Sequence, residues 1–314
     1  MVSPTRWRAL SASVRGASHE KNGQPNQDAV RSRNPGRGHE MLLLAIADGH
    51  GSTRSFRSEK GSALAAEVAL RELAKFVRRL GPDAPLSKIR NQARTRWPKD
   101  LIAAWKAAVR ADLAKNPFTF LDFAAFPEKP PALKPGQDLP ITAYLAYGST
   151  LVALVITSRY IIYSQLGDGD ILTVHEDGKV ARPLPRKHEF MSNQTISLCS
   201  HHADQEFQIR VDAQRGGSAP ALIMLSTDGY ANCFGDDEAF FKVGGDFLEY
   251  LRAEGPSFVR DKLADWLQQS SRDGSGDDIT VGLKPEGAGS ANWAASVPLL
   301  TTVNFSGPEE ADVW

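Results

Sequence analysis

Short, wholly apolar runs divide this chain into segments of strand and helix character. Residues 41–47 (MLLLAIA) and 221–225 contain no polar residue, so each predicts a buried strand. Residues 149–156 and 160–165, rich in β-branched and aromatic side chains, flank a Thr-Ser-Arg turn and predict a hairpin. A further strand is expected at residues 279–283. The hairpin residues expected to face inward or into the sheet are Leu151, Ala153, Val155, Ile161 and Tyr163.

Other segments carry apolar residues every three to four positions, as on one face of a helix. Residues 58–80 have this spacing, as do residues 86–114, with a break expected at Trp97-Pro98. Two more helices are predicted at residues 237–254 and 257–271.

Two segments lack any such period. Six prolines fall within residues 116–140, which predicts a long surface loop, either a substrate-facing flap or a simple insertion. Beyond Lys284 the composition shifts to Gly, Ala, Ser and Pro. We therefore expect one domain over residues 1–285 and a tail or loosely docked extension over residues 286–314.

Composition excludes several classes of partner. The 314 residues include 37 Lys plus Arg and 37 Asp plus Glu, so no global field attracts nucleic acid or an anionic membrane. The two cysteines, Cys199 and Cys233, have no zinc or disulfide spacing and are expected to be packing residues in a reducing compartment. No apolar run approaches the ~20 residues of a membrane span, so a cytoplasmic location is expected.

Aspartates recur at strand edges, next to glycine or a second aspartate. Rigid strand ends can hold charge accurately, and carboxylate oxygens suit hard divalent cations. A single Asp-Gly pair is also a common turn, but several together favour a metal site. The pairs are Asp48-Gly49, Asp168-Gly169, Asp228-Gly229 and Asp277-Asp278, and a fifth carboxylate, Asp28, lies in the polar segment Asn26-Gln27-Asp28.

Six short blocks occur in order along the chain. They are Asn26-Gln27-Asp28, Ala47-Asp48-Gly49-His50-Gly51, Gly148-Ser149-Thr150-Leu151, Gly167-Asp168-Gly169, Ser226-Thr227-Asp228-Gly229 and Asp277-Asp278-Ile279-Thr280. In this order the blocks resemble the type 2C, metal-dependent serine/threonine protein phosphatases. The resemblance spans about residues 11–283, and Gly16-Ala17-Ser18-His19 looks closer to a divergent bacterial branch. It implies an α+β fold, a four-layer α-β-β-α sandwich with two packed antiparallel sheets and a dinuclear metal site at one edge.

The same resemblance implies roles for single residues. Asp48 would bridge two divalent cations, Mn²⁺ or Mg²⁺, with Asp228 and Asp277 completing the first site and the Gly49 carbonyl helping to bind the second. A hydroxide bridging the cations would attack phosphorus in line. Asp28 would act on metal-bound waters, and His50 matches the family's general acid, although a turn histidine with a structural hydrogen bond is the alternative.

Three positions depart from the family pattern. Gln27 stands where a glutamate is usual, and it would still accept a hydrogen bond from a metal-bound water. Gly23 stands where a phosphate-binding arginine is common, which leaves Arg15, His19 and Lys21 as candidates for that contact. Asn232 replaces an aspartate linked to a third cation, so Asp168 alone remains for a possible third site.

These departures keep two other functions open. One is a pseudophosphatase that binds phosphorylated partners without turnover, and the other is a metallohydrolase of small phosphoesters. Against the first, Asp48, Asp228 and Asp277 all persist, although clustered carboxylates are costly without a metal. The expected partner is a phosphorylated protein, by resemblance a serine/threonine kinase or its target, with neither nucleic acid nor membrane involved.

Overall fold

The computed structural model describes residues 9–33, 41–119, 122, 141–186, 196–214 and 219–285. Within this part of the chain, the strands form two antiparallel sheets of five. The β10 sheet has the order β1 (Leu10–Val14), β10 (Ile279–Pro285), β9 (Leu222–Ser226), β6 (Asp170–Val174) and β7 (Val180–Ala181). The β3 sheet has the order β2 (Ala29–Arg33), β3 (Met41–Ala47), β4 (Leu151–Thr157), β5 (Tyr160–Leu166) and β8 (Gln208–Ala213).

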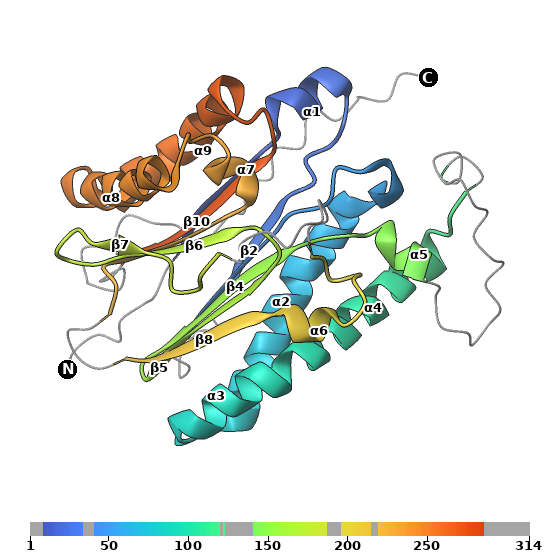
Figure 1. Cartoon of the computed structure of the whole chain (residues 1–314), viewed down its shortest axis with the longest axis horizontal. Coiled ribbons are helices and arrows are strands. Elements are labelled where there is room, and N and C mark those ends of the chain that lie inside the picture. Colours follow the sequence, from blue (N-terminus) through green and yellow to red (C-terminus); the bar gives the residue numbers. More distant parts are fainter. Residues whose placement is uncertain are drawn as a thin grey trace.

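Helices cover the outer face of each sheet, giving the four layers expected (Figure 1). The β3 sheet is covered by α2 (Ser58–Leu80), α3 (Leu86–Thr95) and α4 (Trp97–Lys115). The β10 sheet is covered by α8 (Asp237–Ala253) and α9 (Gly255–Asp273). Short helices lie in the connections: α1 (Ala17–Asn22), the 3₁₀ turn η1 (Thr53–Ser55), α5 (Ile141–Leu145), α6 (Ala203–Glu206) and α7 (Asp228–Ala231).

Three apolar clusters fill the spaces between these layers. In β3, Leu42, Leu44 and Ile46 belong to the cluster between the sheets. Met41, Leu43, Ala45 and Ala47 belong to the cluster under α2 and α4. Because successive side chains of a strand point to opposite faces, both faces of β3 are buried. This explains why its sequence contains no polar residue.

The strongly patterned elements are confirmed. Strand β3 and helix α2 have the predicted bounds, and the predicted break near Trp97-Pro98 falls at Arg96, between α3 and α4. Strands β4 and β5 pair as the predicted hairpin, and all five of its expected core residues are at most 3% exposed. The sequence did not indicate β2 or β8, because each lies at an edge of the β3 sheet and carries arginine among its apolar residues.

Two predictions concern segments outside the described residues. They are the loop at 116–140, of which only residues 116–119 and 122 are described, and the tail at 286–314. Among the described helices, none has both the length and the apolar character required to cross a bilayer.

Candidate metal centre

Three aspartates from different connections meet at one edge of the two sheets. Asp48 directly follows β3, Asp168 lies in the turn between β5 and β6, and Asp228 begins α7 after β9. One carboxylate oxygen of each lies within 4.8 Å of the others. Both sheets therefore contribute to the cluster. Asp168, which the sequence indicated only for a possible third cation, lies in the same group as Asp48 and Asp228.

The turn that carries Asp48 is held by its neighbours on two sides. Thr150 N donates to the Asp48 carbonyl at 2.9 Å, and Asp48 N donates to Thr150 Oγ1 at 3.2 Å. Gly49 N donates to the Gln27 carbonyl at 3.1 Å. A Cβ at Gly49 would lie 2.7 Å from the carbonyl oxygens of Gln27 and Ser58, so this close approach requires glycine.

Asp228 and Asp277 lie on adjacent turns. Asn232 Nδ2 donates to Asp228 Oδ2 at 3.1 Å, so Asn232 orients the Asp228 carboxylate. Asp277 precedes β10, and its half-exposed carboxylate accepts the Asp278 amide at 2.8 Å. The charge of Asp277 acts on Asp228, but Asp277 is not part of the three-aspartate cluster.

Gln27 and Asp28 present buried oxygens beside this cluster. Thr227 Oγ1 donates to Asp28 Oδ2 at 2.7 Å, whereas Asp28 Oδ1 and Gln27 Oε1 are buried with no hydrogen-bond partner among the described residues. A Cβ on Gly51 would lie 3.7 Å from Gln27 Oε1, so that side chain reaches toward the turn after Asp48. Buried acceptors normally have donors, and these two suit the water of a hydrated ion.

The clustered carboxylates shift one another's pKa. Burial raises the pKa of Asp48, and the charges of Asp28, Asp228 and Asp168 raise it further. Burial and neighbouring aspartates also raise the pKa values of Asp28, Asp228 and Asp277. Bound cations would supply the counter-charge for negative charge concentrated in this way.

The donor set fits hard divalent cations. Oxygen ligands bind such ions at about 2.0–2.6 Å, so two ligands of one ion lie at most about 4–5 Å apart. The spacing within 4.8 Å meets that limit. All three donors are carboxylates. Mg²⁺ and Mn²⁺ prefer such oxygen ligands, whereas softer metals prefer sulfur ligands.

His50 lies next to this edge in the turn after Asp48. Its backbone amide donates to the Gly148 carbonyl at 3.1 Å, and its ring packs against Gly148, where a Cβ would come within 2.6 Å of the imidazole Cδ2. Burial lowers the pKa of His50, and the charge of Asp168 opposes this effect. Burial is the larger effect, so the pKa of His50 stays below its ordinary value and the Asp168 charge offsets only part of this shift.

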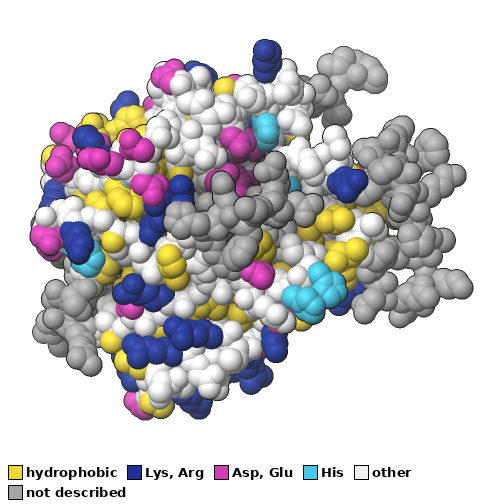
Figure 2. All heavy atoms as spheres, in the orientation of Figure 1, with side chains coloured by type: hydrophobic (Ala, Val, Ile, Leu, Met, Phe, Trp, Pro, Cys, Tyr) yellow, Lys and Arg dark blue, Asp and Glu magenta, His cyan; other side chains and the backbone are white. Residues whose placement is uncertain are grey.

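The three phosphate-binding candidates occupy different environments. Arg15 Nη2 donates to the His19 carbonyl at 3.0 Å, and Arg15 Nε is buried without a partner among the described atoms. His19 Nδ1 lies 2.9 Å from Asp278 Oδ2, and the nearby carboxylate raises the pKa of His19. Lys21 is exposed on α1. Acidic side chains and a histidine gather beside α1 and α7 on the face seen in Figure 2.

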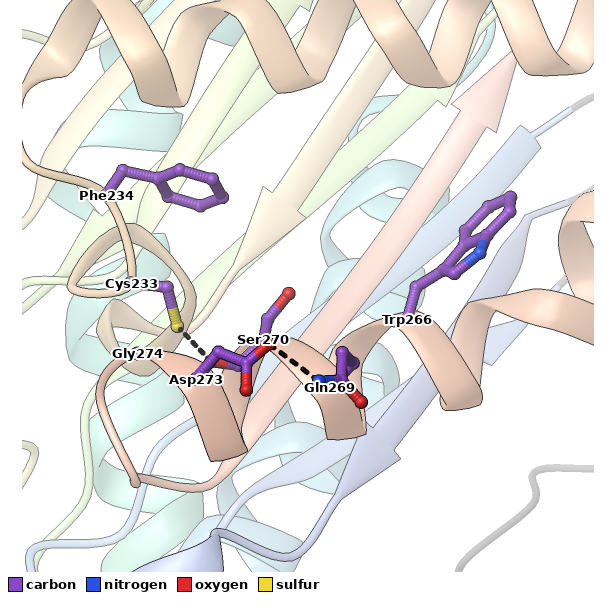
Figure 3. A pocket seen from close by; sticks show the side chains of 7 residues that line it. All are labelled: Cys233, Phe234, Trp266, Gln269, Ser270, Asp273 and Gly274. Carbon is purple, nitrogen blue, oxygen red and sulfur yellow. Dashed lines mark hydrogen bonds between the residues drawn. The ribbon is translucent and has the colours of Figure 1, made fainter.

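A pocket of about 380 Å³ lies between the residues that follow α7 and the C-terminal half of α9 (Figure 3). Cys233 Sγ lies 3.2 Å from the Gly229 carbonyl and 3.3 Å from that of Ser270. None of the three clustered aspartates lines this pocket, so it is separate from the candidate metal centre. Its lining residues are Cys233, Phe234, Trp266, Gln269, Ser270, Asp273 and Gly274.

Sequence reasoning missed residues that hold the site together. Thr227 Oγ1 donates to Asp28 and accepts the amide of Thr280 at 3.0 Å. Asp278 accepts two backbone amides, from Gly16 and Gln27. Thr227 and Asp278 lie next to Asp228 and Asp277 in the six blocks of the sequence. This adjacency is the signal that could have indicated their role.

Comparison with known families identifies one match. The model of the family described as Protein phosphatase 2C matches residues 15–268, which is most of the chain. No curated protein sequence gives a significant match.

Solved structures of similar shape include bacterial phosphatases. The serine/threonine phosphatase Stp1 from Staphylococcus aureus is 14% identical, with 91% of this chain and 97% of that chain covered at a TM-score of 0.53. The serine/threonine phosphatase PstP/Ppp from Mycobacterium tuberculosis is 17% identical, with 88% and 97% covered at a TM-score of 0.51. At these identities the likeness establishes the fold alone.

Proposed function

The chain belongs to the protein phosphatase 2C family, and on this premise we propose that it is a metal-dependent phosphatase of phosphoserine and phosphothreonine. One observation carries the proposal. Asp48, Asp168 and Asp228, which are far apart in sequence, bring carboxylate oxygens within 4.8 Å of one another at the sheet edge. The substrate expected by family is a phosphorylated protein of the cytoplasm, such as a serine/threonine kinase or its target.

Asp48 and Asp228, with Asp277 beside them, would hold one divalent cation, and Asp48 with the Gly49 carbonyl would hold a second. Asp168 would add a ligand to this group. Bound Mn²⁺ or Mg²⁺ supplies charge neutralisation for the phosphoryl oxygens and lowers the pKa of coordinated water. The protein fixes the position of these ligands by hydrogen bonds, which join Asp48 to Thr150 and Gly49 to Gln27.

Gln27 and Asp28 would orient water in the site. Gln27 Oε1 and Asp28 Oδ1 are buried acceptors with no hydrogen-bond partner among the described residues, and the Thr227 hydroxyl fixes the other oxygen of Asp28. His50 would protonate the serine or threonine oxygen as it leaves, a contribution of about 10²–10⁴-fold for a general acid. This role requires a protonated imidazole, which the Asp168 charge favours, whereas burial lowers the pKa of His50 overall.

The test is hydrolysis of p-nitrophenyl phosphate and of a phosphothreonine peptide with added Mn²⁺. We expect both reactions to stop in excess chelator. Asp48→Asn should lower kcat/KM by more than about 100-fold, beyond the usual effect of a residue that only contacts a ligand. Glu72→Gln is the matched control, because Glu72 is a buried carboxylate of α2, bonded to Lys75 and about 20 Å along the helix from Ser58.

Each other result identifies a different function. A protein that binds Mn²⁺ and a phosphopeptide without turnover is a binding module. Faster hydrolysis of nucleotides than of phosphopeptides indicates a metallohydrolase of small phosphoesters. Full activity in excess chelator after dialysis rejects metal-dependent catalysis altogether.

A further inference from the structure

The segment that begins α1 is docked against the turn before β10. A Cβ at Gly16 would lie 2.3 Å from the carbonyl carbon of Asp277, so the two backbones are in direct contact. Ser18 N donates to the Gly276 carbonyl at 2.8 Å. Ser271 Oγ accepts the Ala17 amide at 3.0 Å and donates to the Asp277 carbonyl at 2.8 Å. The two ends of the domain therefore meet beside Asp277.

The Asp278 carboxylate lies at the centre of this contact and is 3% exposed. Gly16 N donates to Oδ1 and Gln27 N donates to Oδ2, each at 2.6 Å. His19 Nδ1 lies 2.9 Å from Oδ2. Both carboxylate oxygens are thus used by backbone amides that lie 262 and 251 residues away in the chain.

Gln27 continues this connection to the other sheet. Its carbonyl accepts the Gly49 amide at 3.1 Å and the Ser62 hydroxyl at 2.5 Å. The backbone of Gln27 is therefore fixed to Asp278 through its amide and to Gly49 through its carbonyl. A continuous path of backbone and hydrogen bonds runs from Asp277, through Asp278 and Gln27, to the turn of Asp48.

We propose that Asp278 is a positioning residue of the metal centre. Its carboxylate holds the Gln27–Asp28 segment at a fixed distance from the Asp277 turn, so that groups from both sides face the same cations. The effect of Asp278 on catalysis rests on the proposed function, whereas its effect on metal binding can be measured without turnover. It also gives a role to the Gly16–His19 segment, whose amide and imidazole complete the environment of Asp278.

The chemistry requires a carboxylate at this position. Two backbone donors approach different oxygens, and an ionised carboxylate offers both oxygens as acceptors and carries no donor of its own. An asparagine side chain in its place would offer one acceptor and set an NH₂ group against the amide of Gly16 or Gln27. Two donors that face each other in a buried site force one segment to move. The substitution also replaces hydrogen bonds to a charged carboxylate by weaker hydrogen bonds to a neutral amide.

Asp278→Asn in the full chain tests the proposal. Mn²⁺ binding, measured by calorimetry, should weaken by about 10–100-fold, the scale of groups that orient metal ligands. At saturating Mn²⁺, kcat for p-nitrophenyl phosphate should fall while KM changes little, because substrate is still bound but the groups around it are displaced. A residue that matters only for folding would lower the melting temperature and leave both quantities unchanged.

His19→Ala provides a second variant that removes one partner of Asp278 and spares both backbone bonds. It should weaken Mn²⁺ binding in the same direction by a smaller factor, while the control Glu72→Gln should bind Mn²⁺ as the wild type does. Wild-type Mn²⁺ affinity in folded Asp278→Asn overturns the proposal. If that variant does not fold, wild-type affinity in His19→Ala overturns it instead. If the wild-type protein binds Mn²⁺ but hydrolyses no phosphoester, the proposed function is wrong. The role of Asp278 is then decided by the Mn²⁺ affinities of the variants alone.

Discussion

Replacing Asp228 with asparagine should stabilise the metal-free protein while weakening its response to metal. The substitution keeps the size of the side chain and removes one negative charge from the Asp48–Asp168–Asp228 cluster. Without cations, burial and the charge of Asp168 raise the pKa of Asp228, which means that the ionised form is unfavourable in the folded state. With cations present, the same carboxylate becomes a metal ligand.

The distances set the size of this effect. Two unit charges 4.8 Å apart repel by about 3.5 kcal/mol at an effective dielectric constant of about 20, and by about 0.9 kcal/mol in bulk water. Asp168 is exposed, so water screens much of the repulsion. We expect the metal-free variant to gain about 1–2 kcal/mol, or about 2–8 °C in melting temperature for a domain of this size.

Thermal unfolding in excess chelator and across a Mn²⁺ titration measures both effects. The variant should melt above the wild type in chelator, and its melting temperature should rise less as Mn²⁺ is added. Glu72→Gln should melt below the wild type in both conditions and keep the full Mn²⁺ response, since Glu72 bonds Lys75 in α2. An Asp228→Asn protein with an undiminished Mn²⁺ response would refute the assignment of Asp228 as a metal ligand.

Three further outcomes are expected. Burial and neighbouring charges raise the pKa of Asp28 and Asp48 in the folded protein. The free energy of unfolding of the metal-free protein should therefore fall as pH rises above their ordinary value of 3.8, and saturating Mn²⁺ should reverse this trend. A flat profile in the metal-free protein contradicts the pKa shifts. Val155→Asp should cost about 4 kcal/mol or more, because Val155 is 0% exposed, whereas the control Ile141→Asp, at an exposed position, should melt near the wild type. Gln27→Glu should lower the Mn²⁺ concentration for half-maximal activity by about 10-fold or more, since a charge would replace the neutral buried oxygen; an unchanged requirement would show that this side chain does not act on the site.

Elements with an unbroken hydrophobic pattern could be predicted from the sequence. The run at residues 41–47 lies between two apolar clusters, so both faces demanded apolar side chains. The period of residues 58–80 reflects one helix face packed on the β3 sheet. Edge strands such as β8 bury fewer of their residues and alternate less clearly, which is why the sequence left them undetected.

For the site, the sequence determined which groups are available. It supplied aspartates at strand edges and glycine at a turn where two backbones come close, because both features can be recognised from neighbouring residues in the chain. Only the tertiary structure decided that Asp168 joins Asp48 and Asp228 while Asp277 lies beside them, and that Asp278 binds the amides of Gly16 and Gln27. Distances between groups more than 100 residues apart are set by how the two sheets pack and register, and no local pattern in the chain encodes them.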